Sequence, residues 1–300
     1  MLHTSWPMSG RDKRFFIIVV FYNPSTAQVE RVLRLSESYN VIIVDNSPVP
    51  IPHVSSREDL RYIPLLSNRG IAYAQNVGIQ KVKEMHGTYI LFLDQDSDVD
   101  MDFPCDILSE FKRLESKEPK LVALGPVVYE KDTGMPYKRY NDMTLIDSSN
   151  QICPTLISSG TVSPTWAFDE VGFMEERLFI DYVDHEWCWR ACSKGFVCCM
   201  NLTVKMRHKV GQRSIRCLGI PFLLASPFRY YYQYRNSCWL QTRKYVPADW
   251  KVKTAIRNLV GFFCIPWHTR SPFAVLRYML KGLLHGCLPN VCLGDGRKTD

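Results

Sequence analysis

The sequence lacks the patterns that mark several common classes of protein. Its 11 cysteines include no C-x-x-C pair and show no zinc-finger spacing. No G-x-G-x-x-G follows the first apolar run, although a dinucleotide-binding fold would require one there. No run reaches the ~18 apolar residues of a membrane-spanning helix, and the first run has no secretory cleavage site. We therefore expect a cytosolic protein whose thiols are reduced.

Acidic residues are scarce in the last third of the chain. From Lys205 onward there are 17 Lys and Arg against 3 Asp and Glu, an excess of +14, whereas the first 204 residues hold 20 against 27, or −7. Such an asymmetry suggests an anionic partner, which could be membrane headgroups, a phosphorylated acceptor or nucleic acid. A solvated basic surface without any partner is the alternative.

Short apolar runs alternate with stretches of helical periodicity, which predicts a three-layer α/β domain with a mostly parallel sheet. The expected strands span residues 15–21, 41–44, 62–66 (an edge strand), 89–93, 121–125 and 196–204, and the expected helices span 26–39, 71–82, 103–117 and 183–194. Ser25 is a candidate N-cap. We expect residues 129–152 to form a surface loop.

The strand expected at 89–93 ends in the alternating residues Asp94-Gln95-Asp96. In an extended chain, two residues that are two apart point the same way, and buried strands of α/β sheets present functional residues at their carboxyl ends. Two neighbouring carboxylates repel each other unless a cation lies between them. Mg²⁺ or Mn²⁺ takes such oxygen ligands and shares them with substrate phosphates, so we expect a metal and phosphate site here.

A second cluster of acids, Asp181, Asp184 and Glu186, surrounds the start of the helix expected at 183–194. Helix N-termini attract carboxylates, so capping is one explanation. Three acids beside His185 exceed what a cap requires, and they indicate a site. One of them could take a proton from an acceptor hydroxyl.

Other uses of the first aspartate pair fit less well. A calcium loop needs Gly at its sixth position and Glu at its twelfth, where this chain has Val99 and Cys105. A phosphatase with an aspartyl nucleophile would place its motif on the first strand. A sugar-nucleotide transferase fits better, because Asp45 at a strand end could bind a base or ribose while a metal on Asp96 neutralises the leaving diphosphate.

Nine short motifs in order then resemble the family 2 inverting glycosyltransferases of the GT-A fold, and within them the bacterial rhamnosyltransferase-like group. The resemblance covers about residues 15–240. The motifs lie at 19–24, 44–47, 68–72, 76–79, 93–97, 159–160, 179–187, at His208 with Gly211, and at 229–236.

The resemblance implies roles for particular residues. Asp184 would be the catalytic base, with Asp181 and Glu186 as runners-up; a helix cap or an ion pair with Arg190 is the alternative for Asp184. Asp96 and His208 would lie at the metal, Mg²⁺ or Mn²⁺. The donor would be bound by residues along the first half of the chain and one beyond it: Asn23, Asp45, Asn68, Arg69, Asn76, Asp94 and Arg235. Arg229 would help to hold the diphosphate or a lipid-linked acceptor.

The family further implies transfer, with inversion, from a nucleotide-diphospho-sugar such as dTDP-rhamnose to a hydroxyl of a growing, polyprenyl-linked surface polysaccharide. A scaffold that binds sugar nucleotides without catalysis is the alternative, and we expect no nucleic-acid partner.

We divide the chain into a flexible N-terminus (1–14), a catalytic domain (15–210, with a nucleotide-binding half 15–125 and an acceptor half 126–210) and a helical, basic and aromatic C-terminal extension (211–300). Short apolar segments at 218–228 and 259–267 suit helices lying in a membrane interface or core helices packed on the body. We expect peripheral attachment to the inner face of the bacterial plasma membrane.

Overall fold

The computed structural model describes residues 12–56, 60–130, 144–208 and 214–288. Its first half alternates strands and helices: β1 (Phe15–Phe21), α1 (Thr26–Ser38), β2 (Asn40–Asp45), α2 (Pro52–Ser55), β3 (Arg61–Pro64), α3 (Ile71–Glu84), β4 (Tyr89–Asp94), α4 (Phe103–Glu115) and β5 (Leu121–Glu130). The predicted strands and helices of this half are confirmed, including Ser25 as the N-cap of α1, where it forms a capping box with Gln28.

The second half contains more strands than we predicted. It continues with β6 (Leu145–Asp147), β7 (Asn150–Ile152), β8 (Val162–Pro164), α5 (Ala167–Glu170), the 3₁₀ turn η1 (Glu176–Leu178), α6 (Val183–Ser193) and β9 (Val197–His208). The prediction of a loop throughout 129–152 was wrong, because β5 extends to Glu130 and β6 and β7 form a hairpin. The short strand β8 was not predicted.

One nine-stranded sheet crosses the described residues in the order β3-β2-β1-β4-β8-β5-β9-β7-β6. Strands β3, β2, β1 and β4 are parallel neighbours, and so are β5 and β9. The antiparallel strand β8 joins these two groups by pairing with β4 and β5. The sheet is therefore mostly parallel in its core, as predicted, with β3 at its edge.

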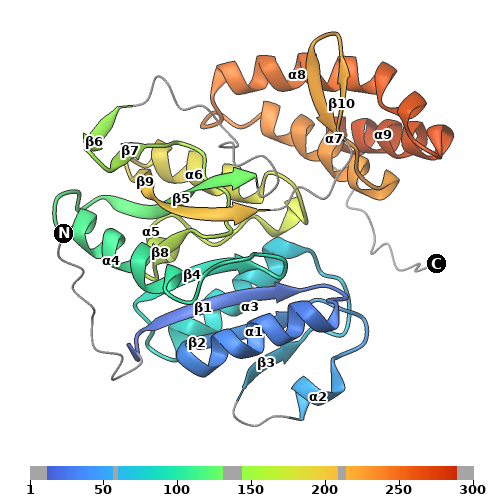
Figure 1. The fold of residues 1–300 in the computed structure, drawn as a ribbon. Coiled ribbons are helices and arrows are strands. Elements are labelled where there is room, and N and C mark those ends of the chain that lie inside the picture. The colour runs from blue at the N-terminus through green and yellow to red at the C-terminus, as the bar shows by residue number, and fades with distance from the viewer. Residues whose placement is uncertain (1–11, 57–59, 131–143, 209–213, 289–300) are drawn as a thin grey trace.

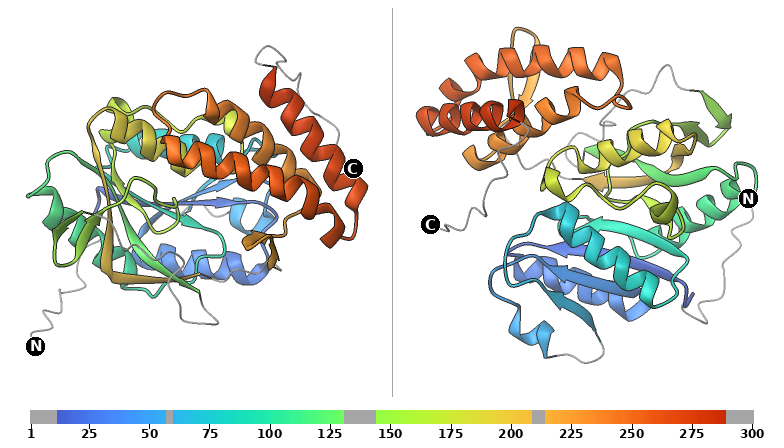
Figure 2. Two further views of the ribbon diagram at one scale, coloured as in Figure 1. Left: turned by 90° about the horizontal axis from the view of Figure 1, so that it is seen from above. Right: turned by 180° about the vertical axis from the view of Figure 1, so that it is seen from behind.

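Helices cover both faces of the sheet because its central strands are apolar on both sides. Phe16 and Ile18 of β1 pack with α3, α5 and α6, whereas Ile17 and Val19 pack with α1 and α4. Figure 1 shows α1 on one face, and the rear view in Figure 2 shows α3 on the other. The contact with α3 is close, since a Cβ at Gly78 would lie 2.7 Å from the Ile18 side chain.

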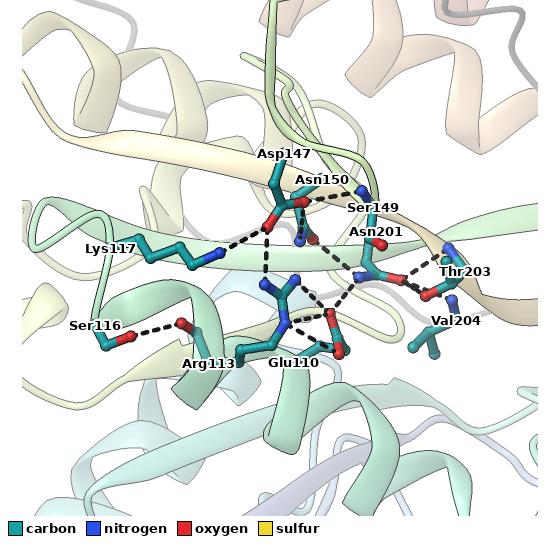
Figure 3. A network of polar contacts seen from close by, with 10 residues as sticks. All are labelled: Glu110, Arg113, Ser116, Lys117, Asp147, Ser149, Asn150, Asn201, Thr203 and Val204. Carbon is teal, nitrogen blue, oxygen red and sulfur yellow. Dashed lines mark hydrogen bonds and ion pairs between the residues drawn. The ribbon is translucent and has the colours of Figure 1, made fainter. Parts of the chain in front are cut away.

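A polar network fastens the β6–β7 hairpin to α4 and β9 (Figure 3). The fully buried Asn201 donates to Glu110 (3.0 Å) and Asn150 (2.9 Å), and Arg113 pairs with Asp147 (2.8 Å). Although burial opposes ionisation, Arg113 and the Ser149 N–H hold the pKa of Asp147 at about 2. The hairpin thus depends on charge-assisted hydrogen bonds more than on apolar packing.

The C-terminal region consists of the hairpin β10 (Ser214–Cys217) and β11 (Ile220–Leu223), then α7 (Pro227–Gln241), α8 (Ala248–Cys264), the 3₁₀ turn η2 (Pro266–His268) and α9 (Pro272–Cys287). A helix at 218–228 was a wrong prediction: a positive φ at Leu218 and at Gly219 makes a turn there, and α7 begins only at Pro227. The predicted boundary at residue 210 lies outside the described residues.

Helix α7 joins this region to the α/β body. Tyr230 and Tyr234 of α7 pack with Phe222, Val275 and Met279 in a separate apolar cluster. At the other end of α7, Leu240 packs against Trp189 of α6. Helix α7 therefore contacts α9 at one end and, at the other, α6, which carries Asp184 and Glu186 of the second acidic cluster. Within the described residues, no helix is both long enough and apolar enough to cross a bilayer.

Candidate active site

The carboxyl ends of β1, β2 and β4 meet at one edge of the sheet. In the strand register Phe21 lies opposite Asp45, and Val20 lies opposite Asp94. Asp45 and Asp94 therefore flank the end of β1, with Asn23 in the loop that follows. Gln95 ties the β1 and β4 ends together, because its amide bonds the backbone N–H (2.7 Å) and C=O (3.3 Å) of Tyr22.

Asp45 is fully buried at this edge. Its carboxylate accepts hydrogen bonds from the Ser47 N–H (2.9 Å) and from the Tyr62 hydroxyl. Burial and the adjacent Asp45 raise the pKa of Tyr62 well above its ordinary value, so Tyr62 stays a proton donor to the carboxylate. Asp45 thus shapes the turn after β2 and the edge strand β3.

The polar loop before α3 is held by a pair of asparagines. Asn46 donates to the Asn68 side-chain oxygen (2.9 Å) and accepts from the Arg69 N–H (2.7 Å), while Asn68 also accepts from the Gly70 N–H (3.1 Å). The exposed Arg69 guanidinium lies 4.2 Å from the Tyr73 ring centre. On the β1 side of this loop, the Asn23 N–H donates to the Ser47 hydroxyl (2.8 Å).

Asp94 and Asp96 differ in environment although they belong to one motif. The Asp94 side chain is partly covered, whereas Asp96 is exposed. Burial first, and then the negative charges of Asp96 and Asp184, raise the pKa of Asp94 to about 7, with Arg229 opposing the shift. Three carboxylates and one guanidinium from separate parts of the chain are therefore close enough to interact electrostatically.

The loop before β8 connects the two acidic clusters. The Asp94 N–H donates to the Ser159 hydroxyl (3.2 Å), which also hydrogen-bonds Ser97 (2.6 Å). One residue earlier, the Ser158 N–H donates to Asp184 (3.3 Å). Asp184 also accepts from the His185 N–H (2.8 Å), so backbone groups orient its carboxylate. Arg190 does not pair with it, which removes one of the two alternatives considered for Asp184.

The other two acids of the second cluster are engaged in ion pairs. Arg229 of α7 binds Asp181 through two nitrogens at 2.8 and 3.0 Å. Glu186 is 1% exposed, pairs with Arg190 (2.8 Å) and accepts from the Tyr245 hydroxyl (2.6 Å). Of these three acids, only Asp184 has a carboxylate that is bonded to backbone N–H groups and is not in an ion pair.

The segment before α6 has a strained backbone. Phe179, Asp181 and Tyr182 have φ values of 66°, 65° and 66°, a region that costs a non-glycine residue about 1 kcal/mol or more. The Phe179 carbonyl accepts from the Ile71 N–H (2.7 Å), so it caps the N-terminus of α3. Gly70 makes this approach possible, because a Cβ there would lie 2.7 Å from Phe179.

Arg235 and Asn236 of α7 hold this segment. Arg235 is 6% exposed and donates to the carbonyls of Arg177 (2.6 Å) and Leu178 (3.0 Å), while Asn236 donates to those of Leu178, Ile180 and Asp181. These bonds fasten α7 to the segment before α6, and the contact of Arg235 with the donor stays a prediction.

Two further residues that we predicted for the site are Asn76 and His208. Asn76 is 8% exposed and bonds the backbone of Met174 in both directions (3.0 and 2.9 Å), so it fastens α3 to the segment before η1. The backbone of His208 ends β9, but its side chain lies outside the described residues.

The carboxylates of Asp94 and Asp96 suit a divalent cation by their chemistry. Hard oxygen ligands favour Mg²⁺ or Mn²⁺, and burial, followed by the negative charges of Asp96 and Asp184, raises the pKa of Asp94. No group of three or more His, Cys, Asp or Glu that could bind a metal alone occurs among the described side chains.

Comparisons with known proteins agree with this architecture. The family described as Glycosyl transferase family 2 matches residues 16–170, more than half of the chain. The dTDP-rhamnosyl transferase RfbF of Shigella flexneri is 30% identical over 290 residues, which cover 91% of this chain and 94% of that protein.

Solved structures show the same fold at low identity. The S. aureus TarS 1-349 structure in complex with UDP-GlcNAc superposes with a TM-score of 0.52 and 14% identity, covering 90% of this chain and 79% of that one. The structure of GalNAc-T7 with UDP, GalNAc and Mn²⁺ superposes with a TM-score of 0.53 and 13% identity, covering 81% of this chain and 54% of that one. The chain thus has the GT-A fold, and it belongs to glycosyl transferase family 2.

Proposed function

We propose that the protein is an inverting glycosyltransferase that is assisted by a divalent cation and uses Asp184 as its general base. The observation that carries this proposal is that two adjacent residues of one loop link the acidic clusters: the Ser158 N–H donates to Asp184 (3.3 Å), and the Ser159 hydroxyl accepts from the Asp94 N–H (3.2 Å). Membership of family 2 supports glycosyl transfer as the reaction. Both lines of support are independent of which sugar is moved.

We assign dTDP-rhamnose as the donor because the 30% identical relative is a dTDP-rhamnosyl transferase. The acceptor would be a hydroxyl of a growing lipid-linked surface polysaccharide. In the reaction, the acceptor oxygen forms a bond to the anomeric carbon while the bond from that carbon to the diphosphate oxygen breaks. The hydroxyl proton passes to Asp184, and attack from the opposite face inverts the anomeric centre.

The protein groups divide this work. Hydrogen bonds from the Ser158 and His185 N–H groups orient the Asp184 carboxylate toward the reacting hydroxyl. Asp94 and Asp96 would hold Mg²⁺ or Mn²⁺, which when bound neutralises charge on the leaving diphosphate. Asn23, Asn68 and Arg69 line the same edge and remain our proposed donor contacts.

Asp45, Asn76 and Arg235 have positioning roles in this proposal. Each is buried and hydrogen-bonded within the protein, and each fixes a loop that borders the site. Asp181 would keep Arg229 beside the carboxylates, and Glu186 would stabilise α6 through Arg190. Asp184 is therefore preferred to both as the base.

The experiment compares wild-type protein with Asp184→Asn, using Asp100→Asn as a matched control at an exposed aspartate. Purified proteins are incubated with Mn²⁺ and a panel of nucleotide sugars, and transfer and release of nucleotide diphosphate are measured. We expect Asp184→Asn to lower kcat by about 10²-fold or more, the usual contribution of a general base, while donor affinity measured by calorimetry stays near wild type.

The outcomes separate the alternatives. Full activity in Asp184→Asn would reject the assigned base. Donor binding without transfer by the wild-type protein to any acceptor would favour the non-catalytic scaffold. A preference for UDP-sugars over dTDP-rhamnose would reject the donor and leave the reaction class intact.

A further inference from the structure

Helix α8 exposes one apolar side to solvent. Only Thr254 and Gly261 of this 17-residue helix are buried. The opposite side carries large apolar residues that are 52% to 65% exposed, namely Val252, Ile256, Leu259 and Phe263. A surface helix of a globular protein normally directs its apolar stripe toward the core. Helix α8 exposes this stripe in addition to the side on which Val260, Phe262 and Cys264 pack against the C-terminal apolar cluster.

Helix α9 repeats this arrangement. Its buried positions include Val275, Met279, Gly282 and Gly286, and it packs closely on α7, since a Cβ at Gly282 would lie 2.5 Å from the Tyr231 carbonyl oxygen. The opposite side exposes Phe273, Leu280 and Leu284, and Leu288 just beyond the helix, while Trp267 between α8 and α9 is 67% exposed. We call these nine side chains on and around the two helices the outer ridge; Figure 2 shows both helices on the outside of the molecule.

Positive charge accompanies the outer ridge. No Asp or Glu occurs between Lys251 and Leu288. Lys253 and Arg257 lie on one side of the α8 stripe, and Arg277 and Lys281 lie within or beside the α9 stripe by helical spacing. Asp249, at the start of α8, is paired with Lys253 (3.1 Å). The surface therefore combines exposed aliphatic and aromatic side chains with Arg257, Arg277 and Lys281, which are in no ion pair with a described acid.

This combination favours an anionic lipid surface over a second protein chain. Interfacial helices have large apolar residues on one side, Lys and Arg at its borders and aromatic residues near the headgroups. A second copy packed on the same ridge would bring like charges together without acids to pair them. No described helix is suited to crossing the bilayer, so the contact would be peripheral.

We propose that the outer ridge docks in the headgroup layer of a membrane that contains anionic phospholipid. Helix α7 supports both ridge helices and also holds the segment next to Asp184 through Arg229 and Asn236. Docking would therefore keep the candidate active site at a fixed distance from the lipid surface. The proposal needs neither the assigned donor nor the assigned base to be correct.

Vesicle flotation tests it with two pairs of matched substitutions. Leu259→Gln with Leu284→Gln changes ridge residues that are 63% and 60% exposed, and the control, Val49→Gln with Leu145→Gln, changes residues elsewhere that are 73% and 59% exposed. All four positions are at the surface, so each variant should fold, which thermal melting would check. A third variant, Arg277→Gln with Lys281→Gln, tests the charges.

We expect wild-type protein to float with vesicles of phosphatidylcholine and phosphatidylglycerol, and less with phosphatidylcholine alone or in high salt. The ridge variant should lower the partition coefficient by at least about tenfold, because two large apolar side chains no longer enter the interface. The charge variant should lose most of the preference for phosphatidylglycerol, and the control should stay within about twofold of wild type.

Flotation of the ridge variant equal to wild type would overturn the proposal. The proposal would also be overturned if sedimentation without lipid showed a dimer of wild type and control but a monomer of the ridge variant, because the outer ridge would then bind a second copy of the chain. Release of nucleotide diphosphate from the donor without vesicles should be equal in wild type and ridge variant. Failure of the proposed function would abolish that release in both and leave flotation unchanged.

Discussion

Asn236→Ala tests whether the strained segment before α6 depends on α7. Asn236 is fully buried, and its amide nitrogen lies 2.9 Å from the Leu178 carbonyl oxygen, 2.8 Å from that of Ile180 and 3.2 Å from that of Asp181. Alanine removes this donor from all three carbonyls. It also removes an acceptor of Arg235, whose guanidinium is left one partner short.

The magnitude follows from the number of groups left without a partner. A buried polar group that loses its hydrogen bond costs about 1–3 kcal/mol, with water or relaxation recovering part of it. Three carbonyls share one amide group, so we expect the free energy of unfolding to fall by about 2–4 kcal/mol. The positive φ angles of Phe179, Asp181 and Tyr182 would then relax, which displaces Asp184 in the next turn.

Chemical denaturation and steady-state transfer kinetics are the assays, both at a temperature where the variant is folded. We expect kcat/KM to fall by more than tenfold, since small misplacements of catalytic groups have large effects. Asn258→Ala is the control, because it removes one hydrogen bond to Ser237 (2.7 Å) within the same region. It should cost about 1 kcal/mol and leave kcat/KM unchanged. If Asn236→Ala resembles this control in both assays, α7 does not position the segment.

Three further predictions concern acid stability, the α3 cap and the metal. Asp147 has a pKa of about 2, below its ordinary value of 3.8, so its contribution is present above pH 4 and is lost as the pH falls toward 2. Between pH 5 and pH 2, the free energy of unfolding of the wild type should therefore fall by about 1 kcal/mol more than that of Asp147→Asn, after allowance for the partly exposed Arg113. Parallel urea titrations measure both values, and an equal fall in the two proteins would show that the Asp147–Arg113 pair contributes nothing. Gly70→Ala places a Cβ 2.7 Å from Phe179 at a φ of +86°, and should lower both the melting temperature and kcat/KM, whereas an unchanged melting curve would argue against the close contact. Chelation of divalent cations should abolish transfer, and so should Asp96→Asn. Added Mn²⁺ should restore transfer by the chelated wild type but not by the variant. Transfer that survives the chelator would reject metal assistance.

Local sequence determined most elements of the first half of the chain. The runs that form β1, β2 and β4 are apolar on both faces, and only a strand buried between two helical layers uses such residues. The Ser25 cap and the amphipathic α4 are equally local features. The carboxylates at the ends of β2 and β4 could be placed at one edge for the same reason, since parallel strands end together.

Short strands that depend on partners could not be predicted. Strand β8 has three residues, and it exists because β4 and β5 offer hydrogen-bonding edges on both its sides. The β6–β7 hairpin depends on Asn201 and Arg113, which are distant in sequence. Residues 218–228 are apolar enough for a helix, but the turn at Leu218 and Gly219 and the β10–β11 pairing prevail over that tendency.

The sequence alone identified the candidate carboxylates, and the tertiary structure decided which of them are engaged in ion pairs. Glu186 and Asp181 look equivalent to Asp184 along the chain, yet Arg190 and Arg229 engage them in ion pairs. Arg229 meets Asp181 only because α7 folds back across the segment before α6, and Ser158 and Ser159 reach both acidic clusters only because β8 lies beside β4. Periodicity and composition are local properties, whereas ion pairing and burial depend on which distant segments pack together, and this difference separates what each level determined.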